Sequence, residues 1–258
     1  MKLFAFSDIH GNMNLFNQIE EFLNQQEETY KCYFLGDACD RGKHGYEIIK
    51  GILNHPHMIY LKGNHEDMFV RAAKEYLNIC EEEGYDPVDY AVRHNYKFSI
   101  YDLMYMGSDL ALWCCNGGAP TFKAWIDDGC PRGIINRLNA LSKRHTVEWN
   151  MDENPIVFDM CHAGCPVDLW DCEDDNVYLW DRTHFNEKWN LYDGRKHLLV
   201  HGHTPMNHID PVCIKWKAHY YMANTKLNLD CATYRTNAIT LVELTTAERK
   251  YFFEDYDV

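Results

Sequence analysis

The feature that most constrains the fold of this chain is a repeated pattern near its amino terminus. Short apolar runs, each followed by a polar cluster that contains glycine, occur at Leu3–Phe6, Tyr30–Leu35 and Met58–Leu61. The intervening segments, about Asn12–Glu27 and Gly45–Leu53, have the length and periodicity of helices. Alternating strands and helices predict a parallel sheet, in which the carboxyl ends of the strands meet at one edge. We therefore expect the polar clusters to form one site at that edge.

The rest of the chain predicts a second sheet and one insertion. Residues from about 84 to 150 are rich in aromatic side chains and turn signals, which indicates a mostly helical insertion. Strand character returns at residues 155–160 and 197–200. Short alternating runs over residues 219–253 predict a meander that closes a second sheet. Because no linker or repeat is visible, we expect an α/β fold with a single domain over residues 1–258.

The composition argues against several classes of protein. The chain of 258 residues has a formal net charge of -14, which disfavours binding to nucleic-acid phosphates. No stretch is long and apolar enough for a membrane span, and the amino terminus lacks the layout of a signal peptide, so we expect a cytoplasmic protein. The 11 cysteines are scattered without a paired C-x-x-C pattern, which favours reduced thiols over disulfides or a thiolate metal site.

The polar clusters that follow the predicted strands carry the candidate chemistry. They contribute side chains with oxygen or imidazole donors, namely Asp8, His10, Asp37, Asn64, His162 and His203. This mixture suits manganese, iron or zinc better than a thiolate site would. Six ligands with one shared carboxylate are enough for two divalent ions about 3.5–4 Å apart, which can activate a bridging water and hold a phosphoryl group. We expect Asp37 to be the shared ligand.

In their order along the chain, these clusters resemble the motifs of the calcineurin-like metallophosphoesterases. The matching segments are Asp8-x-His10-Gly11, Gly36-Asp37-x-x-Asp40-Arg41-Gly42, Gly63-Asn64-His65-Glu66, His162-Ala163-Gly164 and Gly202-His203-Thr204. The pair Asp40 and Arg41 is typical of the phosphoprotein phosphatase branch. Its bacterial and bacteriophage serine/threonine phosphatases are also similar at Asn116-Gly117-Gly118 and at Leu179-Trp180-Asp181-Arg182. The resemblance implies two packed mixed β-sheets flanked by helices, with a dinuclear metal site at the strand ends.

The resemblance also divides the ligands between the two ions. It implies one ion held by Asp8, His10 and Asp37, and a second held by Asp37, Asn64, His162 and His203. Manganese is the first expectation for both ions, with iron and zinc as alternatives. The wider superfamily often has a second ligand histidine where this chain has Pro205. The first ion is therefore expected to rely on water and to bind more weakly.

Further residues receive roles in binding and proton transfer. By resemblance, His65 is not a metal ligand but the general acid that protonates the leaving oxygen, oriented by Asp40. The physics of that pair stands on its own, because a carboxylate favours the imidazolium and fixes its ring. Arg41 and Arg182 are expected to bind phosphate oxygens in forked hydrogen bonds. Asn64 is expected to contact the substrate as well as a metal.

Three features remain open at the level of sequence. His201 precedes His203 by two residues and can face either the site or the core, so its expected role is at most indirect. Cys231-Ala232 stand where many bacterial relatives have threonine and glycine, which leaves the shape of one substrate wall undefined. The inserted aromatics are expected to be core rather than platforms for stacking bases, and they include Trp113, Phe122 and Trp125.

The function that these observations predict is hydrolysis of phosphomonoesters. The expected substrates are phosphoserine and phosphothreonine in proteins, with phosphotyrosine or a small phosphoester as further candidates. The expected reaction is direct attack by hydroxide held on the metals, without a phosphoenzyme. Hydrolysis of dinucleoside polyphosphates such as diadenosine tetraphosphate is the alternative that keeps the same site. A binding protein without turnover is a remote third possibility, because a decayed site would normally have lost ligands.

Overall fold

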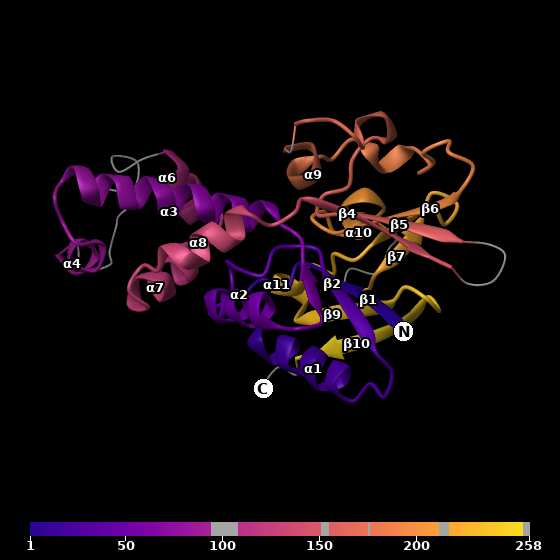
Figure 1. Ribbon diagram of the computed structural model, residues 1–258, viewed down its shortest axis with the longest axis horizontal. Helices are drawn as coiled ribbons and strands as arrows, with labels where there is room; N and C mark the ends of the chain where they lie inside the picture. Colours follow the sequence, from indigo (N-terminus) through magenta and orange to yellow (C-terminus); the bar gives the residue numbers. More distant parts are fainter. Residues whose placement is uncertain (94–107, 151–154, 175, 212–216, 255–258) are drawn as a thin grey trace.

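Two five-stranded sheets packed face to face form the centre of the molecule, with helices on their outer faces (Figure 1). The computed structural model describes residues 1–93, 108–150, 155–174, 176–211 and 217–254. This arrangement confirms the predicted α/β fold with two packed mixed sheets.

The first sheet has the strand order β10-β9-β1-β2-β3. Its parallel strands are β1 (Lys2–Phe6), β2 (Tyr30–Phe34) and β3 (Met58–Tyr60). The connecting helices are α1 (Met13–Asn24) and α2 (Gly45–Asn54). The predicted βαβαβ unit is therefore confirmed. Alternation along β1 divides its side chains between two cores, because neighbouring residues of a strand point to opposite faces.

The second sheet has the strand order β4-β5-β6-β8-β7. Its strands are β4 (Arg144–Trp149), β5 (Ile156–Cys161), β6 (Lys196–His201), β7 (His219–Tyr221) and β8 (Lys226–Asn228). β5, β6 and β8 run parallel to one another, and β4 and β7 pair antiparallel at the two edges. Short helical elements connect the strands, namely η1 (Val167–Leu169), α9 (Asn176–Trp180), η2 (His184–Asn186) and α10 (Met206–Ile209).

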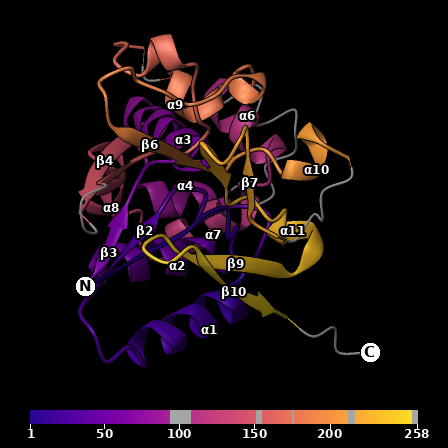
Figure 2. The same cartoon turned by 90° about the vertical axis from the view of Figure 1, so that its right-hand side faces the viewer.

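The end of the chain returns to the first sheet. β9 (Ala238–Glu243) pairs antiparallel with β1, and β10 (Glu248–Phe253) pairs with β9. The prediction that residues 219–253 close the second sheet is therefore wrong for these two strands and holds only for β7 and β8. Strand periodicity shows that a segment is a strand but carries no information about its partner. Figure 2 shows β10 beside α1, whose half-buried Gln18 donates to the main-chain oxygen of Phe253 (3.1 Å).

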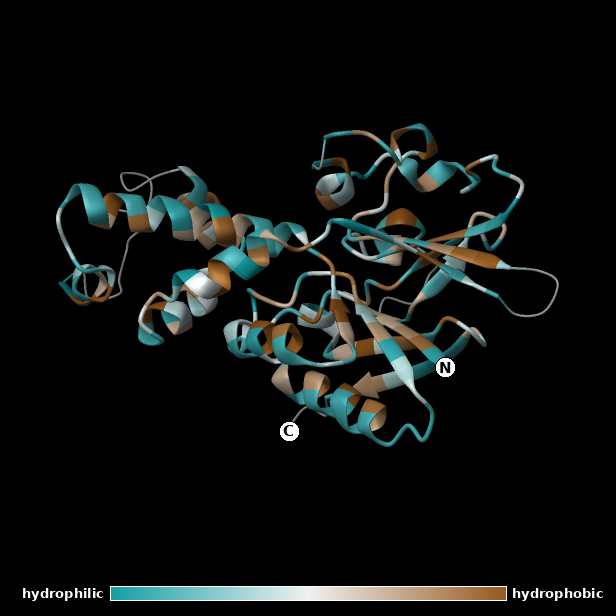
Figure 3. Cartoon of the chain, viewed as in Figure 1, coloured by the Kyte–Doolittle hydropathy of each residue, from teal (hydrophilic) through white to brown (hydrophobic). Residues whose placement is uncertain are grey.

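Separate apolar cores lie on the two faces of the first sheet. Leu3 and Tyr33 face the second sheet and pack with Phe158 and Leu198 between the layers. The neighbouring Phe4 lies on the opposite face, in the core under the helices. Figure 3 shows hydrophobic residues along the strands of both sheets and hydrophilic residues along the outer loops. The burial of both faces anchors the strand ends from which the site is built.

The inserted helices extend to one side of the sheets (Figure 1). They are α4 (Pro87–Arg93), α6 (Ser108–Cys115), α7 (Ala119–Asp127) and α8 (Arg132–Asn139), and they accompany α3 (Asn64–Glu82). Trp113 and Trp125 are fully buried, and Trp113 stacks on Phe69 of α3 at 4.7 Å between ring centroids. Phe122 is also buried, so the three inserted aromatics belong to the core as predicted.

The structure also bears on the expectations about disulfides and membrane spans. The ten cysteines within the described ranges are free thiols, in agreement with the expected absence of a disulfide framework. No helix in the described part of the chain combines the length and the apolar character that a membrane span requires.

Candidate active site

The residues of the predicted site occupy an unusual backbone conformation. Left-handed φ angles occur at Asp8 (56°), His10 (46°), Asp37 (64°), Asp40 (70°), Arg41 (65°) and His203 (67°). Residues other than glycine rarely adopt this conformation, and it persists only where the surrounding structure imposes it. Such residues gather at active sites, so the backbone itself marks these strand ends as functional.

Two glycines allow the loops after β2 and β3 to touch. A Cβ on Gly36 would lie 2.5 Å from the main chain of Gly63. A Cβ on Gly63 would lie 2.3 Å from Asp37 Oδ1. Only glycine permits approaches this close. The contact brings Asp37 against the start of α3, where the main-chain nitrogen of His65 donates to Asp37 Oδ1 (3.1 Å).

Glu66 ties the same two loops together. Its buried carboxylate accepts hydrogen bonds from the main-chain nitrogens of Asp37, Ala38 and Gly63, each at 2.8 Å. The sequence motif contained Glu66, but no role was predicted for it. A carboxylate in the first turn of a helix that follows glycine is the signal that could have indicated this contact.

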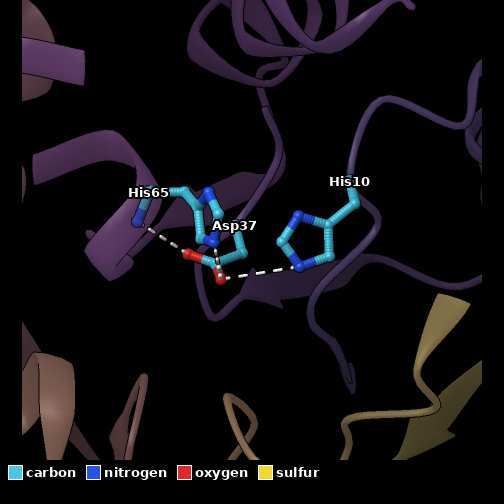
Figure 4. Close-up of side chains that lie close together, drawn as sticks. All are labelled: His10, Asp37 and His65. Atoms are coloured by element: carbon cyan, nitrogen blue, oxygen red, sulfur yellow. Dashed lines mark hydrogen bonds and ion pairs between the residues drawn. The ribbon is translucent and has the colours of Figure 1, made fainter. Parts of the chain in front are cut away.

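The first group of donors surrounds Asp37 Oδ2, as Figure 4 shows. His10 Nε2 lies 3.7 Å and His65 Nε2 lies 3.8 Å from this oxygen. The Nδ1 atom of His10 lies 3.0 Å from the main-chain oxygen of Cys39, where it can only donate. This hydrogen bond fixes the tautomer and leaves Nε2 of His10 free to accept or to bind a cation.

The second group of donors lies around the other oxygen of the same carboxylate. His162 Nε2 is 3.3 Å from Asp37 Oδ1, and His203 completes this group. The side-chain oxygen of Asn64 lies 2.8 Å from His162 Nε2 and 3.0 Å from His203 Nδ1. His162 Nδ1 donates to the main-chain oxygen of Leu35 (2.7 Å), so its Nε2 faces the group. Asp37 thus occupies the position between the groups that the sequence predicted for a shared ligand.

The protonation of two of these donors, His203 and Asp37, fits a divalent cation. Burial and then the positive charges of His162 and Arg182 hold the pKa of His203 well below its usual value. Its Nε2 is buried and has no hydrogen-bond partner in the described part of the chain. Burial alone would raise the pKa of Asp37, but His162 and His65 outweigh it and hold this pKa well below its usual value. A neutral imidazole with a free lone pair and an ionised carboxylate are what metal ions bind.

Asp8 is in the site but outside both groups. Its carboxylate oxygens accept from the main-chain nitrogen of His203 at 3.1 and 3.2 Å. Burial and the nearby carboxylate of Asp230 raise the pKa of Asp8 well above its usual value. The role of Asp8 as a metal ligand stays a prediction. The contact shows how the loop after β1 is joined to the loop after β6.

The predicted acid pair is formed. His65 Nδ1 lies 2.7 Å from Asp40 Oδ2, and both residues are buried. Burial alone would lower the pKa of His65, but the carboxylates of Asp37 and Asp40 outweigh it and raise this pKa. His65 also lies in the first donor group, although the resemblance excludes it as a ligand.

The helical insertion holds the loop that carries Asp40 and Arg41. Trp113 Nε1 donates to Asp40 Oδ2 (2.7 Å), the oxygen that also binds His65. The main-chain nitrogen of Asp40 donates to Thr121 Oγ1, and that of Arg41 donates to the main-chain oxygen of Gly117, both at 3.0 Å. Sequence reasoning assigned Trp113 to the core and missed its polar contact. Buried tryptophans commonly find an acceptor for Nε1, but periodicity does not show which one.

Both predicted phosphate-binding arginines lie at the donor groups. Arg41 Nη1 donates to His10 Nε2 (2.9 Å), and Arg41 Nη2 lies 3.1 Å from His65 Nε2. Arg182 Nη1 donates to Thr204 Oγ1 (2.9 Å), beside His203. The two guanidinium groups therefore approach the site from different loops.

His201 faces away from the donor groups. Its Nε2 lies 2.7 Å from the hydroxyl of Tyr221, and its Nδ1 donates to the main-chain oxygen of Gly202 (3.1 Å). Both ring nitrogens are therefore used within the second sheet. This answers the question that the sequence left open about the direction of this side chain.

Comparison with known proteins identifies the class of this site. The family model of the calcineurin-like phosphoesterases matches residues 1–207, and the chain belongs to this family. The solved structure of a "putative diadenosine tetraphosphatase" is 13% identical, with 97% of this chain and 92% of that chain covered and a TM-score of 0.56. A cold-active protein-tyrosine phosphatase of a psychrophilic Shewanella species is 12% identical, with 97% and 80% covered and a TM-score of 0.52. At these identities the two structures show a shared fold.

Proposed function

We propose that this phosphoesterase is a metal-dependent phosphatase that hydrolyses phosphomonoesters on protein side chains, phosphoserine and phosphothreonine above all. Phosphotyrosine and small phosphoesters are secondary candidates within the same reaction. Membership of the calcineurin-like family supports a hydrolase of phosphoric esters. The preference for phosphomonoesters is our inference from the acid pair.

The observation that carries the proposal is the pair of His65 and Asp40 beside the guanidinium of Arg41. An alkoxide released from serine or threonine is a poor leaving group, so its departure needs a proton in the transition state. With Nδ1 held by Asp40, a protonated His65 has Nε2–H available to give that proton. Arg41 Nη2 lies 3.1 Å from the same nitrogen and can only donate, so with His65 protonated it would turn to the oxygens of the departing phosphoryl group.

The proposed function includes two bound metal ions. Two divalent cations, for which manganese is preferred over iron and zinc, would be held by Asp8, His10, Asp37, Asn64, His162 and His203. When bound, they would activate water and offset the charge of the phosphate. The chain itself would bind the phosphate through Arg41 and Arg182, and Asn64 would contact it from the start of α3. Such local cations are needed because the formal net charge of -14 repels a phosphorylated substrate.

Hydrolysis of dinucleoside polyphosphates is the second candidate. It is favoured by the shared fold with the putative diadenosine tetraphosphatase. Cleavage of a phosphoanhydride in a dinucleoside polyphosphate releases a nucleoside phosphate, which is a much better leaving group than an alkoxide. That reaction depends less on a positioned acid, so the pair of His65 and Asp40 favours the phosphomonoester.

The test compares initial rates of the manganese-loaded protein on four substrates. These are phosphoserine, phosphothreonine and phosphotyrosine peptides and diadenosine tetraphosphate, with Asp37→Asn as the inactive control. We expect faster turnover of the peptides. We also expect His65→Asn to slow the phosphoserine peptide by about 100-fold or more, the usual range for loss of a general acid. Faster cleavage of the dinucleotide, with little effect of His65→Asn, would reverse the assignment.

A further inference from the structure

The segment after β8 forms the wall whose shape the sequence left open. It turns through left-handed residues at Ala232 (φ 51°) and Asn237 (φ 47°), which bracket the short helix α11 (Thr233–Thr236). Asp230 Oδ1 accepts from the main-chain nitrogen of Ala232 at 2.8 Å. Thr236 Oγ1 donates to the main-chain oxygen of Cys231 at 2.9 Å. These hydrogen bonds define the turn that carries Tyr234.

The ring of Tyr234 covers the guanidinium of Arg41. The Cζ atom of Arg41 lies 4.1 Å from the ring centroid. The ring of His10 meets the same tyrosine edge-on, with 5.7 Å between centroids and an interplanar angle of 82°. Tyr234 is 37% exposed, so its ring is open to solvent as well as to the site. One aromatic residue thus contacts both a predicted metal ligand and a predicted phosphate-binding arginine.

We propose that Tyr234 is a positioning residue that holds the fork of Arg41 toward the phosphate. The inference rests on the proposed phosphatase function of this site. An exposed arginine has many rotamers, and only those that keep its nitrogens beside the donor groups can bind the phosphate. A ring at this distance attracts the guanidinium through its π face and removes the other rotamers.

The surroundings of Arg41 show why such a restraint is needed. Arg41 and Tyr234 line one side of a cavity of about 390 Å³, which also contains Lys43 and the carboxylate of Glu254. Without the ring, the guanidinium has room to turn into this cavity and an opposite charge to turn toward. Glu254 accepts from Asn12 Nδ2 at 2.7 Å, so its negative charge is held at the lining of this cavity.

Binding of inorganic phosphate tests this role without turnover. The probe is orthophosphate, titrated by calorimetry into the manganese-loaded wild type and the variants Tyr234→Leu and Tyr234→Phe. We expect Tyr234→Leu to weaken binding by about 3- to 10-fold, the range of a partly exposed cation–π contact. Tyr234→Phe keeps the ring and should stay within about twofold of the wild type. Because the side chain lies at the surface, both variants should keep the melting temperature of the wild type.

A second background isolates the contact with Arg41. In Arg41→Met protein, Tyr234→Leu should have no further effect on phosphate binding, since the two residues act as one unit. Equal phosphate affinity of the wild type and Tyr234→Leu would overturn the inference. So would a weakening of phosphate binding by Tyr234→Leu that is just as large in the Arg41→Met background. So would a wild type that binds no orthophosphate at millimolar concentration. If the wild type binds phosphate in a manner that depends on Tyr234 but hydrolyses no phosphoester, the proposed function fails and this inference stands.

Discussion

Replacing Trp113 by phenylalanine would test how the inserted helices act on the site. The substitution removes the N–H that donates to Asp40 Oδ2 at 2.7 Å and keeps an aromatic ring against Phe69. Asp40 is fully buried, and its Oδ1 already has no hydrogen-bond partner in the described part of the chain. After the substitution, His65 would be the remaining side-chain donor to Oδ2 among the described residues.

The magnitude follows from the charge of the acceptor. A hydrogen bond to a charged group contributes about 1.5–3 kcal/mol, and its loss should lower the melting temperature by about 3–12 °C in a chain of this size. A carboxylate that is free to rotate would also misalign His65. We expect turnover of a phosphoserine peptide to fall by about 10-fold or more, because general acid catalysis contributes about 100-fold or more in total. Turnover of 4-nitrophenyl phosphate, which has a better leaving group, should fall less.

Trp125 provides a matched control for this experiment. It is also fully buried and packs against Phe69, but its Nε1 has no hydrogen-bond partner among the described residues. Trp125→Phe therefore removes the same atoms without removing a polar contact. Equal losses of stability in the two variants, together with an unchanged ratio of the rates on the two substrates, would refute the role of the indole N–H.

Further predictions concern the loops, the metals and pH. Gly63→Ala places a methyl group 2.3 Å from Asp37 Oδ1, so the purified protein should bind less manganese per chain; full metal content would contradict the steric argument. Manganese should raise the melting temperature of the wild type by mass action but not that of Asp37→Asn, and equal shifts would exclude Asp37 from the metal site. Burial alone would raise the pKa of Asp181, but hydrogen bonds from His184 and Thr183 lower it below its usual range. The ionised group therefore stabilises the fold above the unfolded pKa of about 3.9, and this contribution is lost as the pH falls further. Urea unfolding should show a deficit for Asp181→Asn at neutral pH that shrinks in strong acid; a deficit that does not depend on pH would disprove the assignment.

The sequence was sufficient to predict those elements that depend on patterns within one short segment. Apolar runs followed by glycine-containing clusters determined β1, β2 and β3, and the rule for parallel strands placed Asp37 and His65 at one edge. The partner of β9 could not be predicted, because the pattern of residues from Ala238 to Glu243, all of them buried, indicates a strand but not the strand with which it pairs. The contacts of Trp113 and Tyr234 join segments far apart in the chain, and no pattern within either segment encodes them.

The return of the last strands to the first sheet has a consequence during synthesis on the ribosome. β1 lies in the interior of its sheet, between β2 and β9, yet β9 begins only at residue 238. Until then the nascent chain carries an unpaired apolar strand edge, which is a template for association with other chains. The site residues, up to His203, are all translated before that edge is covered. All the proposed metal ligands are therefore present in the nascent chain before the first sheet can close.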